Sequence, residues 1–333
     1  MIGVTLGGGV GRLQGTHGLL LDALVSVRLV TAKGKLVEAS ASSNPDLFWA
    51  IRGAGANFGV VTSATYKLHP LINGGSILNA DLYYPANKSL AYFKAVEAFG
   101  DNLPPRLASI TFATWNSSIN SIQVAANWVY YGPRAEGLKL LQPLLDLKPT
   151  AAVISDVRYN RLAATAGDNF DAIVCQPKAI RSLYGINQKK YSAAAYQRAF
   201  DKMAGFFRDH PGGRNSALSF EFFPNQASGA VPADETAYPW RDATGYLVPN
   251  FSWDAGDDAT ATAAGKLGLE LRQELARTSG YDGITVFVNY ARGDEGVENI
   301  YGRDKLPRLV RLKKAWDPDN VFAYYHPLPT DYS

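Results

Sequence analysis

The chain has 333 residues, of which 47 % are hydrophobic and 19 % are charged. This length and composition predict one large or two smaller folded domains with a sizeable core, and they exclude a disordered chain. The formal net charge of +3, without a dense run of Lys and Arg, argues against a nucleic-acid partner, and no apolar run is long enough for a membrane span.

The cysteine and histidine content excludes two further classes of protein. Cys175 is the single cysteine, so no disulfide framework is expected, and the four histidines do not follow a metal-ligand spacing. We therefore expect no metal site. No signal peptide is recognisable at the N-terminus, and the localisation is left open.

The first expected elements follow a glycine-rich start, "GVTLGGGVGRLQGTHGLLLDA", which contains Gly7, Gly8, Gly9 and Gly11. Two runs rich in β-branched residues around a glycine turn predict two strands. Asn44, Pro45 and Gly53 mark the start and stop of a short helix, and a Val- and Thr-rich strand follows it. These elements cover residues 24–31, 36–39, 45–53 and 57–68.

From residue 73 onward, strand-like and helix-like runs occur in groups rather than in strict alternation. This grouping favours an α+β fold, an antiparallel sheet backed by helices, over a doubly wound parallel sheet. The expected strands are 76–84, 107–115, 121–132, 216–224, 247–253 and 283–290. The expected helices are 89–100, 135–147, 193–210, 258–280 and 304–316.

The initial glycine run raises the question of which contact requires a backbone without side chains. Such a loop can bind an anion through its N–H groups or lie flat against a ring, but it can also be a tight corner without a ligand. Its spacing matches neither the dinucleotide-binding nor the P-loop motif. A second glycine cluster, "RGAGANFGVV" at 52–61, suggests one extended ligand across both segments.

The ordered series GGG-x-G, GL-x-x-D, "DLFWAIRG" and "FGVV" resembles the flavin-binding region of berberine bridge enzyme-like oxidoreductases, of the vanillyl-alcohol oxidase or PCMH-type fold. "VNYARGDE" and "KLPRLVRLKKAWDPDNVF" resemble the closing segment of that family. The resemblance implies a partial FAD-binding domain at 1–72, rejoined by 281–333, and a substrate-binding domain at 73–280.

The resemblance also implies how FAD is held. Met1 falls inside the family pattern, so the N-terminal FAD subdomain, with its attachment His and the nearby Cys, is expected to be lacking. FAD is therefore expected to bind without a covalent link. The implied cofactor contacts are Gly7, Gly8, Gly9, Gly11, Gly59, Val60, Val61 and Asn289.

Tyr290 is the first catalytic candidate, because it ends an expected strand and the resemblance places it near the flavin ring. A tyrosine needs a nearby cation, the flavin or a carboxylate to act as a base near neutral pH. Glu221 is the second candidate. In "SALSFEFFP", alternation places Glu221 opposite the Phe-rich core face, either on a solvated sheet surface or lining a substrate cleft.

Other polar residues carry weaker predictions. Asn250 and Ser252 share one face of the next strand and could bind substrate, or they could be surface residues, with Asn250 a glycan acceptor. Arg241 is more readily a structural ion pair than a substrate contact. His17 is more readily a main-chain hydrogen-bonding residue than a base, and Asp22 is expected to cap its own turn.

The resemblance implies an FAD-dependent oxidase of secondary metabolism that takes a hydride from a small organic alcohol, sugar or secondary metabolite and passes electrons to O₂. Tyr290 would be the base or polarising group, assisted by Glu221. Two alternatives stay open. One is a non-redox relative that uses its cleft as a binding module or cyclase-type catalyst without FAD, and the other is a partial, marginally stable product. A longer form could be secreted.

Overall fold

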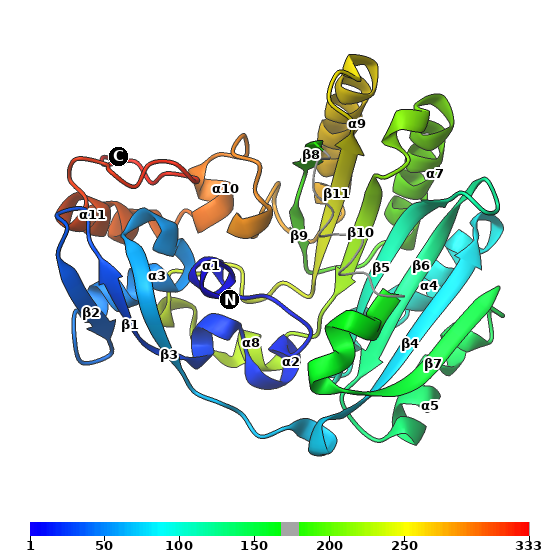
Figure 1. Ribbon diagram of the computed structural model, residues 1–333, viewed down its shortest axis with the longest axis horizontal. Helices are drawn as coiled ribbons and strands as arrows, with labels where there is room; N and C mark the ends of the chain where they lie inside the picture. Colours follow the sequence, from blue (N-terminus) through cyan, green and yellow to red (C-terminus); the bar gives the residue numbers. More distant parts are fainter. Residues whose placement is uncertain (168–179, 333) are drawn as a thin grey trace. The chain divides into compact units, whose positions relative to one another are not determined.

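The computed structural model describes residues 1–167 and 180–332, so Cys175 lies outside the described residues. The chain forms two compact units (Figure 1). Unit 1 consists of Met1–His69, Asn225–Ala243 and Thr285–Ser333, and unit 2 consists of Pro70–Pro224 and Thr244–Ile284. The segment 225–243, which the sequence placed in the middle domain, therefore packs with the two ends of the chain.

Unit 1 combines a small antiparallel sheet with short helices. In the described part of this unit the sheet has the order β2-β1-β3. Its strands are β1 (Leu24–Val30), β2 (Leu36–Ser40) and β3 (Val60–Tyr66). Its helices are α1 (Ile2–Gly7), α2 (Gln14–His17), α3 (Pro45–Ala54), α8 (Gln226–Ala230), α10 (Val297–Tyr301) and α11 (Leu306–Trp316).

The central strand β1 buries Leu24, Val27 and Leu29 and exposes Val25. Strict alternation would place Leu24 and Val27 on opposite faces. Two register shifts against β3, between Leu24 and Ser26 and between Arg28 and Leu29, account for the irregular pattern.

Helix α3 begins at Pro45, as the sequence predicts, because proline needs no N–H partner in the first turn. Asn44 precedes it in a left-handed conformation with φ of 47° and makes no side-chain cap. Instead its Nδ2 donates a hydrogen bond of 2.7 Å to Glu38 O. The backbone leaves helical geometry at Arg52 and Gly53, where the sequence predicted the stop.

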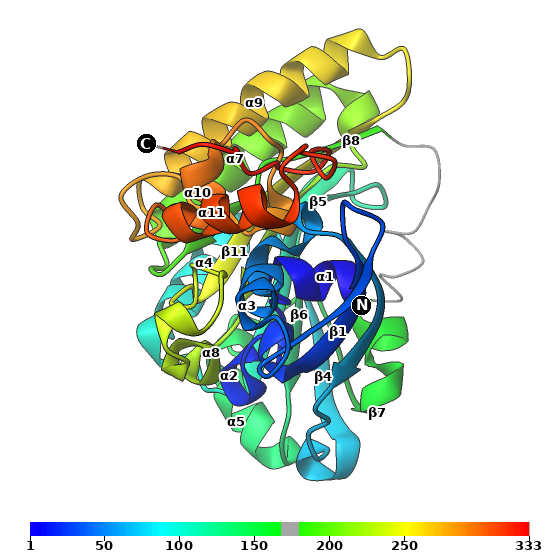
Figure 2. The ribbon, with the colours of Figure 1, turned by 90° about the vertical axis from the view of Figure 1, so that its left-hand side faces the viewer.

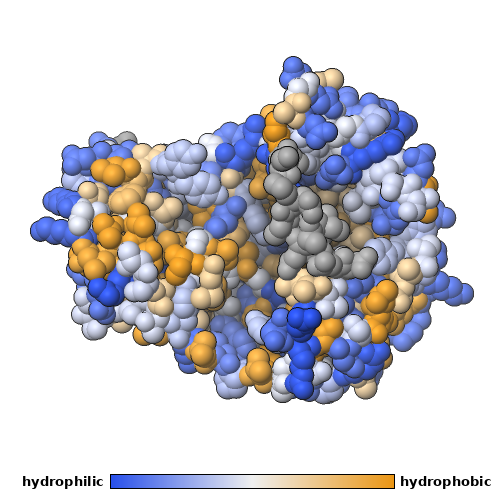
Figure 3. All heavy atoms as spheres, viewed as in Figure 1, coloured by the Kyte–Doolittle hydropathy of each residue, from blue (hydrophilic) through white to orange (hydrophobic). Residues whose placement is uncertain are grey.

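Several large apolar side chains of unit 1 remain at its surface. Val4, Val25, Leu36 and Val60 are 45 %, 50 %, 50 % and 59 % exposed. Figure 3 shows hydrophobic spheres gathered over this unit, at the left of the view. An apolar surface of this kind is unusual for a region that contacts only water.

Unit 2 is a larger antiparallel sheet with helices on one face. Among the described residues its strand order is β7-β4-β6-β5-β10-β11-β8, and β9 pairs with β11. Its strands are β4 (Ser76–Pro85), β5 (Leu107–Asn116), β6 (Ser121–Tyr130), β7 (Ala151–Arg158), β8 (Ile180–Leu183), β9 (Ile186–Gln188), β10 (Ala217–Phe222) and β11 (Gly245–Trp253). Its helices are α4 (Ser89–Glu97), α5 (Arg134–Leu145), α7 (Ala193–Asp209) and α9 (Asp258–Ala276).

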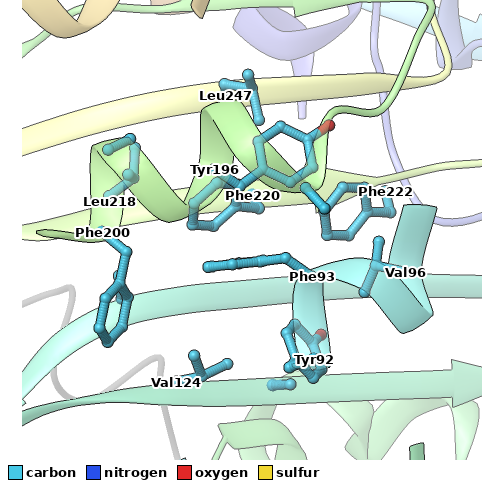
Figure 4. Packing of buried hydrophobic residues seen from close by; sticks show 14 of the residues in the cluster. Tyr92, Phe93, Val96, Val124, Tyr196, Phe200, Leu218, Phe220, Phe222 and Leu247 are labelled. Carbon is cyan, nitrogen blue, oxygen red and sulfur yellow. The ribbon is translucent and has the colours of Figure 1, made fainter. Parts of the chain in front are cut away.

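The helix-covered face of this sheet is a continuous aromatic core. Phe220 and Phe222 of β10 are fully buried, as the alternation predicts. The Phe220 ring lies 5.1 Å from the rings of both Phe93 in α4 and Tyr196 in α7 (Figure 4). Helix α7 has its apolar residues on one stripe, which is the pattern of a helix packed on a sheet. The mixed helix and antiparallel-sheet fold expected from the sequence is confirmed.

Among the elements that differ from the expectation are residues 283–290 and β7. Residues 283–290 do not form a strand: Val286 N–H bonds to Asn299 O, and Val288–Tyr290 form the 3₁₀ turn η9. The β-branched run is buried by irregular packing without a sheet partner. Conversely, β7 was not expected, because this edge strand is largely exposed and its sequence lacks a clear alternation.

No helix within residues 1–167 and 180–332 combines the length and hydropathy needed to cross a bilayer. In that same part of the chain, His, Cys, Asp and Glu side chains do not gather in sets of three or more that could hold a metal ion.

Candidate functional site

Gly7 lies where α1 meets the η9 turn. A Cβ on Gly7 would stand 1.7 Å from Asn289 Oδ1 and 2.7 Å from Val288 Cγ1, so no side chain fits there. Asn289 Nδ2 donates to Gly3 O at 3.2 Å. Its Oδ1 is buried and has no hydrogen-bond partner among the described residues. This junction therefore holds an unpaired acceptor directly against bare backbone.

Gly8 and Gly53, one from each glycine cluster, both pack against Tyr238. A Cβ on Gly8 would lie 2.8 Å from the Tyr238 ring, and one on Gly53 would lie 2.4 Å from Tyr238 N. Tyr238 N–H donates to Arg52 O at 3.1 Å. Gly8 and Gly53 both have positive φ, which glycine adopts without strain. The two clusters thus share a protein partner.

The rest of the first cluster divides into a packed and an open position. Gly9, with φ of +79°, would place a Cβ 2.3 Å from Leu20 Cβ, and Leu20 N–H donates to Gly9 O. A Cβ on Gly11 would meet nothing within 4 Å. The Gly11 N–H donates to Gln14 Oε1 at 3.3 Å. Gly9 therefore serves packing, whereas Gly11 has room beside it.

The second cluster begins β3 and contacts α1. A Cβ on Gly59 would lie 2.6 Å from Val30 O, so this glycine allows the strand to pair closely with β1. Val60 is 59 % exposed and Val61 is half-buried. Gly55 packs against Leu6 of α1, with a Cβ distance of 2.8 Å. The structure therefore brings both predicted cofactor-contacting segments together within unit 1.

Tyr290 ends the η9 turn next to this junction. It is half-buried, its N–H donates to Phe287 O at 2.8 Å, and its ring meets the Phe287 ring edge-on at 5.2 Å. The expectation that Tyr290 ends a strand is wrong, because the chain turns tightly here. The turn nevertheless places Tyr290 immediately after Asn289, beside Gly7.

Glu221 lies in unit 2, on the sheet face opposite the aromatic core. It is 8 % exposed, which argues against the freely solvated face that the sequence left open. In the sheet register it stands between Ile110 of β5 and Tyr246 of β11. A carboxylate in such surroundings needs polar neighbours, because burial disfavours its charged form.

Asn250 and Ser252 follow on the same face of β11. Asn250 pairs with Ala217 on one side and Leu183 on the other, and Ser252 is 4 % exposed. Ser252 N–H donates to Ser216 Oγ at 2.9 Å. Ser252 is therefore buried, whereas Asn250 is half-buried and paired on both sides within the sheet, which disfavours Asn250 as a glycan acceptor.

The weaker candidates Arg241, Asp22 and His17 make contacts within the protein. Arg241 forms an ion pair with Asp22, through bonds of 2.8 and 3.1 Å, and also donates to Thr236 Oγ1. Asp22 Oδ2 accepts Leu19 N–H, so it caps its turn as expected. The His17 ring stacks on His69 at 4.3 Å. Burial, and secondarily His69, lower the pKa of His17.

Sequence reasoning missed a polar cluster on the face of the unit 2 sheet opposite the aromatic core. Asn127 Nδ2 donates to Asp81 Oδ1 at 2.6 Å and to Asn79 Oδ1 at 2.7 Å, and Asn79 Nδ2 donates to Asp81 Oδ2 at 3.0 Å. All three residues are at most 5 % exposed. Polar residues at alternate positions in apolar strands were the available signal.

This cluster shares a row of the sheet with Glu221. Asp81 opposes Asn127, Asn127 opposes Ile110, and Ile110 opposes Glu221. Directly opposed residues point to the same face. Two buried carboxylates therefore lie on one face of unit 2, separated by the width of the intervening strands.

Sequence reasoning also missed Asn57, which follows α3 and is completely buried. Its Nδ2 donates to Tyr301 Oη at 2.9 Å, and its Oδ1 accepts Leu328 N–H at 2.8 Å. Burial raises the pKa of Tyr301 well above its usual value, so its hydroxyl stays protonated and donates to His326 O at 2.6 Å. These contacts join residues far apart in the chain, which no local pattern reveals.

Comparison with known proteins gives the family of the chain. The family model "Berberine and berberine like" matches residues 286–329, which include η9 and α11. The FAD-linked oxidoreductase fogF of Aspergillus ruber is 48 % identical over 342 residues, covering 99 % of this chain and 67 % of the relative. The chain belongs to the berberine bridge enzyme-like FAD-linked oxidoreductases. It spans about two thirds of the length of this relative.

Two solved structures have the same fold. Physcomitrella patens BBE-like 1 superposes with a TM-score of 0.82 at 22 % identity, covering 100 % of this chain and 71 % of that one. A carbohydrate oxidase from Microdochium nivale superposes with a TM-score of 0.76 at 23 % identity, with 100 % and 71 % coverage. The expectations of the family and of an oxidoreductase are confirmed, and the name of the FAD-linked relative supports FAD as the cofactor.

In the first glycine cluster, Gly7, Gly8 and Gly9 pack against Asn289, Tyr238 and Leu20, and Gly11 is the position with room for a ligand. Gly7 leaves no side chain at the junction with η9, the buried Asn289 Oδ1 offers an unused acceptor, and Gly11 faces open space. The Gly8 N–H is already bonded to Thr5 O, and that of Gly11 to Gln14. Contacts to FAD from this segment therefore stay a prediction, and Gly11 is the position that has room for them.

Proposed function

We propose that this berberine bridge enzyme-like protein is an oxidase that takes a hydride from a carbon of a small organic alcohol, sugar or secondary metabolite and passes the electrons to O₂. Bound FAD would supply the hydride acceptor. The Gly7–Asn289 junction, with Tyr290 beside it, is the observation that supports this proposal most directly. Related folds include a carbohydrate oxidase, which supports an alcohol-type substrate.

In this proposal unit 1 holds the cofactor without a covalent link. Gly7, Gly8, Gly9 and Gly11 would contact it through the main chain. Gly59, Val60 and Val61 would contact it at the start of β3, and Asn289 Oδ1 would accept a hydrogen bond from it. Each of these residues lies in a segment that contacts another of the set.

Tyr290 would take the hydroxyl proton of the substrate. Its turn fixes the backbone through the bond from its N–H to Phe287 O, and the Phe287 ring restricts the motion of its own ring. As a phenolate, its Oη would accept the substrate hydroxyl proton, and a tyrosine needs a nearby cation, the flavin or a carboxylate for this near neutral pH. Loss of the hydroxyl proton to Tyr290 would then accompany loss of the hydride from the carbon that bears this hydroxyl.

Glu221, Asn250 and Ser252 would bind polar groups of the substrate in unit 2. They share one sheet face, and because Glu221 and Ser252 are buried and Asn250 is half-buried, a substrate hydroxyl would exchange hydrogen bonds with them largely away from water. Glu221 would assist by accepting a substrate hydrogen bond. This proposal of substrate binding concerns the residues of unit 2 alone.

The experiment has a binding part and a turnover part. The protein is purified with added FAD, and we expect a yellow protein whose melting temperature rises with flavin concentration. A colourless protein that does not respond to FAD would instead support the binding-module alternative. Oxygen consumption is then measured with panels of alcohols and oligosaccharides.

Tyr290→Phe tests the catalytic assignment. We expect turnover to fall by about 10²-fold or more, the usual effect of losing a general base, while the yellow colour persists. Tyr324→Phe, at a solvent-exposed tyrosine, is the matched control. Unchanged turnover in Tyr290→Phe would remove Tyr290 from the mechanism without affecting the assignment of FAD.

A further inference from the structure

The segment 321–328, which follows α11 and which we name the C-terminal strap, is held at its start by a buried ion pair. Figure 2 shows the chain after α11, coloured red, returning past α10 and α11. Lys313 and Asp317 have completely buried side chains, with Nζ and Oδ2 2.6 Å apart. Asp317 accepts the N–H groups of Val321 and Phe322, and Lys313 Nζ donates to Phe322 O.

The far end of the strap is attached to Asn57. Asn57 Oδ1 accepts Leu328 N–H at 2.8 Å, and Tyr301 Oη donates to His326 O at 2.6 Å. Lys313 Nζ also donates to Asn57 O at 3.1 Å, so the two attachments are linked. Asn57 lies two residues before Gly59, at the beginning of the second glycine segment.

The middle of the strap contacts the η9 turn. Tyr325 Oη donates to Val288 O at 3.1 Å, and Val288 is the first residue of the turn that ends at Tyr290. Burial, with a smaller contribution from Glu295, raises the pKa of Tyr325, so this hydroxyl remains a donor at neutral pH. The neighbouring Tyr324 is fully exposed and makes no such contact.

We propose that the C-terminal strap positions both the η9 turn and the start of β3, with Tyr325 and Asn57 as its positioning residues. The strap is fixed at two buried points, and its middle bears on the carbonyl of Val288. It thereby sets where Asn289 and Tyr290 stand relative to Gly7, and where Gly59 begins its strand. Neither positioning residue touches the reacting atoms.

The local conformation of the strap supports a defined position rather than a loose end. His326 has φ of 46°, a conformation that non-glycine residues rarely adopt without surrounding contacts. Its ring lies 4.1 Å from the Tyr325 ring and is 9 % exposed. The Tyr325 ring is therefore restrained on the side of His326 while its hydroxyl meets Val288.

Tyr325→Phe is the main test, because it removes the hydroxyl and keeps the ring. Hydrogen exchange is measured on the amides of Tyr290 and Ala291, which bond to Phe287 O and Val288 O. We expect exchange to accelerate about three- to tenfold, as for the loss of one neutral hydrogen bond. Tyr324→Phe should leave these amides unchanged. Equal rates in wild type and Tyr325→Phe would overturn the proposal, as would acceleration that is equal along α11.

A second measurement connects the strap to turnover and rests on the proposed function. In the FAD-loaded protein, Tyr325→Phe should lower kcat about three- to tenfold with little change in KM, because the turn shifts but the substrate contacts remain. Altered KM with constant kcat would overturn positioning of Tyr290. If the protein shows no oxidase activity at all, the proposed function fails, whereas the exchange result still decides the role of the strap.

Asn57→Ala tests the other attachment. We expect faster exchange of Leu328, whose N–H loses its acceptor, and a lowered affinity for FAD with the Gly59 segment displaced. If this variant does not fold, Tyr325→Phe still decides the proposal. A folded Asn57→Ala protein with unchanged exchange and unchanged FAD affinity would remove Asn57 from the positioning set.

Discussion

The two units are stabilised in different ways. Unit 2 has long strands, amphipathic helices and one aromatic core, in which Phe220 meets Phe93 and Tyr196. Unit 1 depends on individual contacts: glycines that leave space for a neighbour, a buried Lys313–Asp317 pair and an asparagine that joins three segments. The first kind of structure tolerates many sequences that keep its hydrophobic pattern, whereas the second depends on single residues.

The largest expected effect comes from the aromatic core of unit 2. Phe220→Ala should lower the free energy of unfolding by about 4 kcal/mol, through lost burial and the cavity left behind. Phe220→Leu should cost clearly less, because it refills most of the space. Urea unfolding followed by fluorescence measures both. A loss as large in Phe220→Leu would show that this core depends on shape at one residue, as unit 1 does.

The buried ion pair of unit 1 should give the next largest effect. Lys313→Met leaves the Asp317 carboxylate buried without its cation, and we expect a loss of about 3 kcal/mol in the free energy of unfolding. The pair now keeps the pKa of Asp317 low: burial acts to raise it, but the bonds from Lys313, Phe322 and Val321 outweigh that effect. The double variant Lys313→Met, Asp317→Leu should recover part of the loss, as measured by urea unfolding.

Substitutions at two glycines of the first cluster distinguish a role in packing from a role in ligand contact. Gly9→Ala should cost about 1–3 kcal/mol of stability, because its positive φ and the nearby Leu20 leave no place for a methyl group. Gly11→Ala should leave thermal stability unchanged but weaken FAD binding, measured by flavin titration. Unchanged affinity in Gly11→Ala would show that the open space beside Gly11 is not part of the cofactor contact.

The smallest expected effect is a pH dependence that arises at His326. Burial lowers the pKa of its imidazole, against a raising contribution from the nearby Glu295 and from the Ala291 backbone. The unfolded chain therefore binds the proton more readily, so stability is complete above about pH 6.5 and falls as the pH drops toward the lowered pKa.

His326→Asn should flatten this part of the stability profile, because asparagine tolerates the left-handed conformation and does not titrate. Thermal unfolding between neutral and mildly acidic pH is the measurement. His17 shifts in the same direction, so His17→Asn serves as a comparison. A profile that keeps its slope in His326→Asn and loses it in His17→Asn would move the effect to the stacked His17–His69 pair.

The contrast between the units also explains how much could be predicted from the sequence. The strands containing Phe220 and Asn250 were predictable because their side chains alternate, and α3 because Pro45 and Gly53 mark its limits. The position of Tyr290 in a turn was not, because a β-branched run looks the same in a strand and in irregular buried backbone. Asn57 was missed because its partners are Tyr301 and Leu328, which only the folded chain brings together.

The sheet register of unit 2 constrains how its hairpins can change in length. Asn116 faces Ser121 across the turn between β5 and β6, and the row that contains Asn127 and Glu221 depends on that pairing. A slip of this pairing by one residue would turn Asn127 toward the aromatic core and bring Trp128 out of it. The completely buried Trp128 therefore fixes the register, and residues inserted in this turn should be taken up by the loop while both strands stay in place.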